Sequence, residues 1–167
     1  MKSKVLTVFA AAALLAACET APTEQAQTTG EGQAEETVVT EEVTEQTPAP
    51  GSQEQLQQEV GSKVYFAFDK STLSEEARET LKAQAGWLKE YEGVTVTIEG
   101  HADERGTREY NLALGERRAN AVKDYLTALG VDPNRLRTIS YGEERPAVVG
   151  HDKEAWAKNR RAVTVVD

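Results

Sequence analysis

The sequence has little cysteine or histidine, two residue types from which many metal and catalytic centres are built. Its 167 residues include a single cysteine, Cys18, and two histidines, His101 and His151, which lie 50 positions apart. Protein zinc sites usually draw about three or four ligands with tighter spacing. No glycine–serine nucleophile motif is present, and adjacent loop carboxylates such as Asp103 and Glu104 are usually just solvated. The sequence therefore predicts no enzyme activity, no metal and no other cofactor.

Long apolar runs are also lacking. The longest, residues 5–17, is 13 residues long and includes a threonine, whereas a membrane-spanning helix needs about 20 apolar residues. Lys2 and Lys4 precede this run, and the small residues Ala16 and Ala17 end it at the expected cleavage point. Residues 1–17 are therefore predicted to be a secretory signal peptide, with an uncleaved N-terminal anchor helix as the alternative.

The lone cysteine closes this signal. Residues 15–18 read LAAC, which resembles the bacterial lipobox, where the cysteine becomes the lipidated first residue of the mature chain. A single exported cysteine cannot form an internal disulfide, so Cys18 cannot stabilise the fold in that way. Lipidation explains its presence instead. The alternative is a chance cysteine near a cleavage site. Attachment of several acyl (palmitate-type) chains would anchor the protein firmly to a membrane.

Basic and aromatic residues are absent from the next segment. Residues 19–60 contain ten Glu, no Lys or Arg and no aromatic residue, and they are rich in Thr, Gln, Ala and Pro. Such a composition buries too little apolar surface to offset the entropy of ordering, and its like charges extend the chain. We predict that residues 18–60 form the lipidated Cys18 and a disordered acidic tether, with a short helix starting at residues 53–60.

The net charge of −9 belongs to this tether. Residues 61–167 carry 17 basic and 18 acidic side chains and are close to neutral. A nucleic-acid-binding domain usually shows a strong basic excess, so nucleic acid is not an expected partner. We interpret residues 61–167 as one folded domain.

Hydrophobic periodicity predicts alternating strands and helices in this domain. We expect strands at 63–68, 94–98, 136–141 and 162–166, helices at 74–91 and 108–129, and a short helical turn around Trp156. Ser74 and Thr107 are the expected N-caps, and Gly130 the expected C-cap. The βαβαββ order, with one short extra helix, predicts an α/β (α+β) two-layer sandwich.

The stretch EGHADERGTREYN, residues 99–111, concentrates charge of both signs at a predicted strand–helix junction. Backbone N–H groups at such junctions attract anions, and Gly100 and Gly106 allow sharp turns or close approach. The histidine in this stretch is interpreted as structural, and Glu104 as a rim or solvated charge.

The second predicted helix carries an anomaly. Val122 and Leu126 mark its apolar face, and the same face reaches Arg118 and Asn111. A buried cation is costly unless it is paired. Two readings remain open from the pattern: Arg118 forms a structural ion pair with Asp103 or Asp69, or it points into a cleft below the charged loop.

These segments resemble a known family. The sequences VYFAFDKSTLSEEA, VTIEGHADERGTREYNLALGERRANAVKDYL and ISYGEERPAVVGHDKEAWAKNRRAV, within residues 64–163, are similar to the OmpA-like peptidoglycan-binding domains, and the lipobox layout is similar to that of the peptidoglycan-associated lipoproteins within that family. The family pattern N-x-x-L-x-x-x-R-A-x-x-V-x-x-x-L begins here at Asn111.

The resemblance implies a ligand and a site. Family members bind the peptide stem of peptidoglycan non-covalently, especially diaminopimelate, whose side-chain end carries an ammonium and a carboxylate. By position, Asp103 is expected to hold the ammonium and Arg118 the carboxylate. The remaining expected lining residues are Phe68, Asp69, Arg105, Thr107, Asn111 and Leu114. This assignment favours the cleft reading of Arg118.

The resemblance also implies a location and partners. The protein is expected at the periplasmic face of the outer membrane, held by lipid on Cys18, tethering that membrane to the wall as part of the Tol–Pal system in envelope integrity and cell division. Its expected protein partner is the periplasmic propeller protein of that system. The alternative is a wall anchor of another envelope assembly. Two features depart from the family: Arg108 stands where proline is common, and Glu19 follows the lipidated cysteine, which leaves membrane sorting open.

Overall fold

The computed structural model describes residues 47–167. The predicted signal peptide, Cys18 and most of the predicted tether lie outside the described residues. The elements are, in order, α1 (Gln53–Glu59), β1 (Lys63–Tyr65), α2 (Glu75–Glu90), β2 (Val96–His101), α3 (Arg108–Ala128), the 3-10 turn η1 (Pro133–Arg135), β3 (Leu136–Gly142), α4 (Lys153–Asn159) and β4 (Arg161–Val166). No helix among them is long and apolar enough to span a bilayer.

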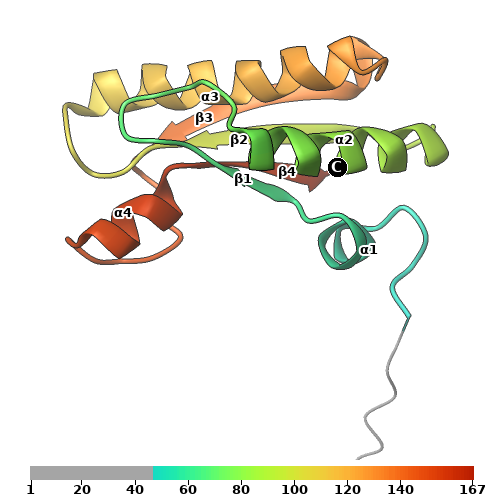
Figure 1. The fold of residues 1–167 in the computed structure, drawn as a ribbon, viewed down its shortest axis with the longest axis horizontal. Helices are drawn as coiled ribbons and strands as arrows, with labels where there is room; N and C mark the ends of the chain where they lie inside the picture. The colour runs from blue at the N-terminus through green and yellow to red at the C-terminus, as the bar shows by residue number, and fades with distance from the viewer. Residues whose placement is uncertain (1–46) are drawn as a thin grey trace, which may run out of the picture. The chain divides into compact units, whose positions relative to one another are not determined.

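The four strands form one mixed sheet in the order β1-β4-β2-β3. Strands β2 and β3 are parallel and are joined through α3, while β4 runs antiparallel to both β1 and β2. Helices α2 and α3 lie together on one face of the sheet, and the short helices α1 and α4 lie near its two ends (Figure 1). The predicted two-layer α/β sandwich with a short extra helix is confirmed.

The core lies between the sheet and the two long helices. Its fully buried side chains share the spacing that predicted the elements: every third or fourth residue on the helices and every second on the strands. They include Leu81, Leu88, Val96, Ile98, Val122 and Leu126. The predicted caps are also present, because the hydroxyls of Ser74 and Thr107 accept N–H bonds in the first turns of α2 and α3, and Gly130, at φ +92°, follows the end of α3.

Two strand ends differ from the prediction by three residues, and the other strand boundaries differ by no more than two. β1 ends at Tyr65 rather than at residue 68, because the chain turns away from the sheet at Asp69, which has a left-handed φ of +57°. β2 runs to His101 rather than stopping at 98, because β3 and β4 pair with it on both sides through Gly100. The second difference brings the charged loop directly to the end of a central strand.

Helix α1 corrects the predicted boundary between tether and domain. A short helix was expected at residues 53–60, but as the end of a disordered tether. Instead Leu56 is completely buried in the core, and the side chain of Gln53 bonds the Thr164 carbonyl and the Val166 N–H of β4. Burial of an apolar side chain supplies the free energy that the tether composition lacks. The folded region therefore begins before α1, not at residue 61.

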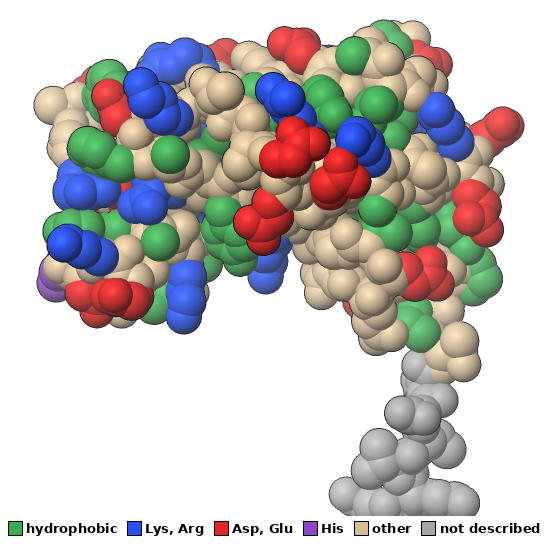
Figure 2. Space-filling view, viewed as in Figure 1, with side chains coloured by type: hydrophobic (Ala, Val, Ile, Leu, Met, Phe, Trp, Pro, Cys, Tyr) green, Lys and Arg blue, Asp and Glu red, His purple; other side chains and the backbone are tan. Residues whose placement is uncertain are grey.

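The surface of the described region mixes both signs of charge. Figure 2 shows acidic and basic side chains interspersed over the visible face, without one large patch of either sign. This distribution agrees with the near-neutral charge of residues 61–167.

Candidate functional site

A cleft of about 240 Å³ opens where the β1–α2 and β2–α3 loops meet the start of α3. It is lined by Phe68, Asp69, Asp103, Arg105, Gly106, Tyr110, Asn111, Leu114 and Arg118. The structure thus brings together seven of the eight predicted ligand-binding residues. Thr107 is the exception: its hydroxyl accepts from the Tyr110 N–H at 3.2 Å as the N-cap of α3.

The cleft exists because α3 approaches β2 very closely. An added Cβ on Gly100 would lie 1.8 Å from the Gly115 carbonyl oxygen, so only glycine fits there. At Gly106 the φ of +116° lets the loop turn into the helix. Gly115, on the facing helix, packs against Gly100 and the Ser140 hydroxyl. These glycines set the position of the loop that carries Asp103.

Arg118 forms the floor of the cleft. The side chain is completely buried, and its guanidinium donates to the carbonyl oxygens of Lys70 at 2.9 Å, His101 at 2.7 Å and Ala67 at 3.3 Å. Burial lowers the pKa of Arg118 to about 10, which still leaves it charged at neutral pH. Each terminal nitrogen keeps a further N–H, so two donors remain for a carboxylate.

The structure decides between the two readings of Arg118. Among the described residues it bonds neither Asp103 nor Asp69, and both carboxylates have other partners. Carbonyl oxygens satisfy it in place of an ion pair. The buried charge is therefore held by neutral groups, and its field remains directed at the cleft.

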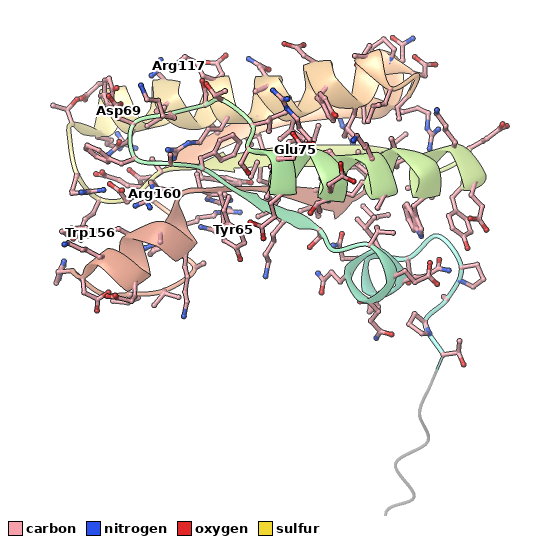
Figure 3. The ribbon with its side chains drawn as sticks, in the orientation of Figure 1. Tyr65, Asp69, Glu75, Arg117, Trp156 and Arg160 are labelled. Carbon is pink, nitrogen blue, oxygen red and sulfur yellow. The ribbon has the colours of Figure 1, made fainter. Side chains whose placement is uncertain are left out.

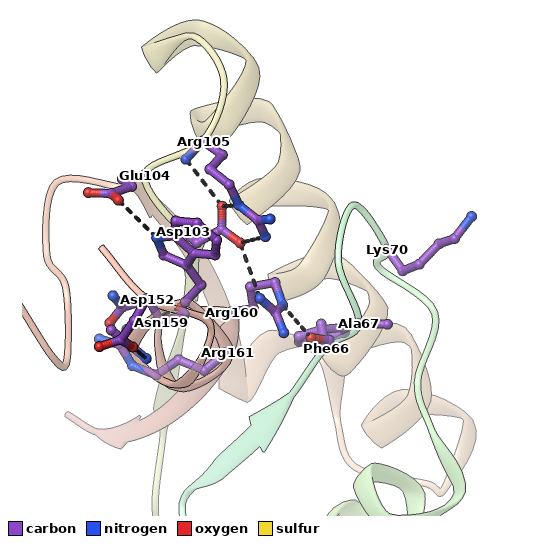
Figure 4. A network of polar contacts seen from close by, with 12 residues as sticks. Phe66, Ala67, Lys70, Asp103, Glu104, Arg105, Asp152, Asn159, Arg160 and Arg161 are labelled. Carbon is purple, nitrogen blue, oxygen red and sulfur yellow. Dashed lines mark hydrogen bonds and ion pairs between the residues drawn. The ribbon is translucent and has the colours of Figure 1, made fainter. Parts of the chain in front are cut away.

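Asp103 lies above this floor, at the end of the loop that follows β2. Its carboxylate is almost fully buried and accepts from Arg105 at 3.1 and 2.6 Å and from Arg160 at 3.3 Å. Burial alone raises the pKa of Asp103, but the hydrogen bonds from Arg105 and Arg160 outweigh it and hold the pKa below its usual value. Asp103 is thus a fixed anion at neutral pH. Figure 4 shows this network.

The β1–α2 loop supplies the rim of the cleft. Asp69 accepts a hydrogen bond from the Tyr110 hydroxyl, and this bond raises the pKa of Tyr110. Its left-handed backbone is one that aspartate tolerates better than most residues. The neighbouring Phe68 is 58% exposed, and the Arg105 guanidinium lies 4.0 Å from its ring centroid. An aromatic face and an anion therefore stand side by side at the entrance.

The inner wall consists of Asn111 and Leu114 on the first turns of α3. Both are buried, and the Asn111 amide donates to Glu143 in the loop after β3. Leu114 presents an apolar surface between the charged groups, which lowers the local dielectric and strengthens their fields. The inner wall is therefore buried and is tied to the loop after β3.

His101 behaves as a structural residue. It is 1% exposed, neither ring nitrogen has a hydrogen-bond partner among residues 47–167, and its ring lies 5.6 Å from that of Tyr141. Burial lowers its pKa to about 4, so the ring is neutral at pH 7. No cluster of His, Cys, Asp or Glu within residues 47–167 has the arrangement of a metal site.

Three residues of the site were missed by sequence reasoning: Tyr110, Trp156 and Arg160. Trp156 on α4 also contacts Arg105, whose guanidinium carbon lies 4.1 Å from the Trp156 ring centroid. Its indole N–H donates to Glu104 at 2.8 Å. Glu104 therefore links the β2–α3 loop to α4, and the interpretation of Glu104 as a rim or solvated charge is corrected. Figure 3 shows Trp156 and Arg160 on the same side of the fold, below Asp69. No local pattern could reveal contacts that span some fifty residues.

Comparison with known proteins matches residues 65–160 to the OmpA family. The peptidoglycan-associated lipoprotein of Brucella melitensis is 53% identical over 118 residues, covering 71% of this chain and 70% of the relative. That of Haemophilus influenzae is 46% identical over 160 residues, covering 96% and 95%. The crystal structure of the peptidoglycan-associated lipoprotein from Burkholderia pseudomallei superposes with a TM-score of 0.62 at 42% identity, covering 64% of this chain and 90% of that one.

Proposed function

Because this chain belongs to the OmpA family, we propose that it binds peptidoglycan non-covalently and holds the wall to the membrane that carries its lipid anchor. The ligand proposed for the cleft is the zwitterionic end of diaminopimelate in the peptide stem. Asp103 takes the ammonium and Arg118 the carboxylate, while Phe68, Asp69, Arg105, Asn111 and Leu114 line the cleft. Relatives named peptidoglycan-associated lipoprotein, at 46–53% identity, support the peptidoglycan-binding part of this proposal.

One observation carries the proposal. Arg118 is completely buried, keeps unused N–H donors and lines the same small cleft as Asp103, which is an anion at neutral pH. Fixed charges of opposite sign in a partly desolvated cleft fit a ligand that carries both charges at matching positions.

The anchor and partners complete the proposal. Cys18 carries the lipid, the acidic segment after it spans the distance to the wall, and the protein faces the periplasm from the outer membrane. The alignment with the Haemophilus influenzae lipoprotein, which covers 96% of this chain, supports a shared layout that includes the N-terminal region. We further propose the Tol-system propeller protein as a partner, with a wall anchor of another assembly as the alternative.

The binding test is co-sedimentation with purified diaminopimelate-type peptidoglycan. Asp103→Asn keeps the shape of the side chain and removes its charge; Arg118→Lys keeps the charge and removes the planar fork. Both are expected to lose most binding, by about tenfold or more, as truncation of a buried charge partner does elsewhere. The proposal fails if both folded variants sediment like the parent.

Matched controls come from the exposed face of α3. Asp124→Asn and Arg117→Lys make the same chemical changes at exposed positions outside the cleft, and they are expected to bind like the parent. Released soluble muropeptides after long incubation would instead indicate a wall-cleaving enzyme. Labelling with palmitate, with Cys18→Ala as control, tests the anchor, and co-purification from cells separates the Tol partner from the alternative assembly.

A further inference from the structure

The anion proposed to receive the ligand ammonium is already occupied by a side chain of the same loop. Arg105 reaches back over two residues and makes a two-point contact with Asp103, Nε to Oδ1 at 3.1 Å and Nη2 to Oδ2 at 2.6 Å. Its backbone N–H also donates to Oδ1 at 3.2 Å. A guanidinium in this fork geometry occupies both oxygens of the carboxylate. These are the same oxygens to which a ligand ammonium would bind.

Two aromatic rings hold Arg105 in this position. Its guanidinium carbon lies 4.0 Å from the ring centroid of Phe68 and 4.1 Å from that of Trp156. The Trp156 ring is itself fixed by the bond from its indole N–H to Glu104. Cation–π contacts with two rings favour this rotamer without burying the side chain, because the Arg105 side chain stays 35% exposed.

The two arginines on Asp103 differ in how firmly they are fixed. Arg160 is 15% exposed, and its Nε also donates to the Phe66 carbonyl at 3.0 Å, so it is part of the folded framework. Arg105 is 35% exposed, and within the described part of the chain its side-chain hydrogen bonds all go to Asp103. Of the two, Arg105 is the one that can leave without breaking a backbone contact.

We propose that Arg105 is an internal competitor for the ligand cation: it closes the Asp103 subsite, and the incoming ammonium takes its place. This inference rests on the proposed function, because it uses Asp103 as the ammonium subsite. It goes beyond the expectation that Arg105 lines the site, because in this proposal the Arg105 side chain lowers the affinity for the ligand. The exchange is of one cation for another on the same carboxylate, so the charge of the subsite is unchanged.

The competitor has a consequence for specificity. A ligand that carries the carboxylate without the ammonium can reach Arg118 but has nothing to exchange for Arg105. A ligand with both groups opens the subsite, at an affinity reduced by the closed population. If the closed arrangement holds about four molecules in five, the apparent affinity is about fivefold below that of the open site.

The experiment uses the full chain with Trp87→Phe, which leaves Trp156 as the only tryptophan. The probe is a soluble disaccharide tetrapeptide containing meso-diaminopimelate, titrated by calorimetry and by Trp156 emission. Arg105→Gln is expected to bind the probe about fivefold more tightly. The emission of Arg105→Gln without probe should already differ from that of the parent and should change little on binding, whereas the parent should show a clear shift.

Two controls sharpen this test. Arg108→Gln removes the same charge at the first residue of α3, where the side chain is exposed and pairs with Glu144 rather than Asp103. This variant should match the parent in affinity and in Trp156 emission. A probe acetylated on the diaminopimelate side-chain amine should bind weakly to the parent and should leave Trp156 emission unchanged. Arg105→Lys, which keeps the charge but loses the fork, should lie between parent and Arg105→Gln, and it carries the comparison if Arg105→Gln does not fold.

The outcomes separate the two levels of the hypothesis. If the parent does not bind the probe, the proposed function fails. If the parent binds and Arg105→Gln binds equally or more weakly, or if Trp156 emission in the parent does not respond to the probe, Arg105 is not a competitor and the inference is overturned while the binding function stands.

Discussion

Gly100 of β2 and Gly115 of α3 touch through their backbones. A Cβ on Gly100 would lie 1.8 Å from the Gly115 carbonyl oxygen, and one on Gly115 would lie 2.8 Å from the Gly100 oxygen. No side chain can fit between the strand and the helix at this crossing. The contact places the start of α3, and therefore the cleft, directly over the end of β2.

Replacing this glycine should be among the most damaging single changes in the domain. Gly100→Ala forces the helix and strand apart and is expected to lower the free energy of unfolding by about 3 kcal/mol or more. Gly86→Ala is the matched control, since nothing lies within 4 Å of its added Cβ. In mid-helix that change should stabilise by about 0.5–1 kcal/mol. Urea denaturation measures the free energy of unfolding of both variants. If Gly100→Ala lowers it by no more than about 0.5 kcal/mol, as an ordinary surface substitution does, the close contact is contradicted.

Most of the fold could be predicted from local pattern. The long helices were placed within two residues of α2 and α3 because their apolar spacing and their caps, Ser74 and Thr107, are encoded locally. The end of β1 and the inclusion of α1 in the folded domain could not be predicted from local pattern. They depend on where the chain leaves the sheet at Asp69 and on a pocket for Leu56 formed by distant segments.

The site divides in the same way. Helical spacing alone identifies Arg118 as a candidate site residue, because a charge on an apolar helix face must be compensated. The partners it found, three backbone carbonyls, carry no side-chain signature. Likewise the pairing of Arg105 with Trp156 joins a loop to a helix some fifty residues later, and one sequence contains no signal for it.

Thr107 is expected to serve the helix rather than the ligand. Its hydroxyl caps α3, so Thr107→Ala should cost about 1 kcal/mol of stability. Thr107→Ser retains the hydroxyl and should keep both the stability and the peptidoglycan binding of the parent. Thermal unfolding and co-sedimentation measure the two properties. If a fully stable Thr107→Ser protein loses peptidoglycan binding, Thr107 contacts the ligand and its role is not limited to capping α3.

Removing the Arg118 guanidinium should destabilise the fold as well as weaken binding. Arg118→Met keeps most of the apolar volume but leaves the carbonyls of Lys70, His101 and Ala67 without donors. The expected loss is about 3–5 kcal/mol. Arg117→Met, at an exposed position, should change stability by no more than about 0.5 kcal/mol. Equal effects in denaturant titrations would show that the carbonyls find other partners.

Acid should destabilise the domain through His101. Its folded pKa is about 4 against a reference of 6.5, so the unfolded chain takes up a proton that the folded chain excludes. Stability is therefore full above pH 6.5 and falls as the pH drops toward 4, by about 2 kcal/mol at pH 5.

His101→Leu removes this titration and should flatten the stability profile between pH 7 and 5. The pKa of His151 is raised by its hydrogen bond to Glu104, which has the opposite effect on stability, so both proteins are measured in a His151→Gln background. Asp103 and Glu104 have lowered pKa values and contribute only at more acid pH. Denaturant titrations at each pH provide the comparison. Parallel profiles for the two proteins would exclude His101 as the source.

The N-terminal limit of the fold is tested at Leu56. As part of a disordered acidic tether, this side chain would have no folded-state contacts, and its truncation would leave stability unchanged. In the structure it is completely buried in the core, so Leu56→Ala is expected to lower the free energy of unfolding by about 2–5 kcal/mol. Leu112→Ala, at a leucine that is 48% exposed on α3, makes the same chemical change and should cost less than about 1 kcal/mol. If urea denaturation gives the two variants the same stability, α1 is not held in the core and the domain begins at β1.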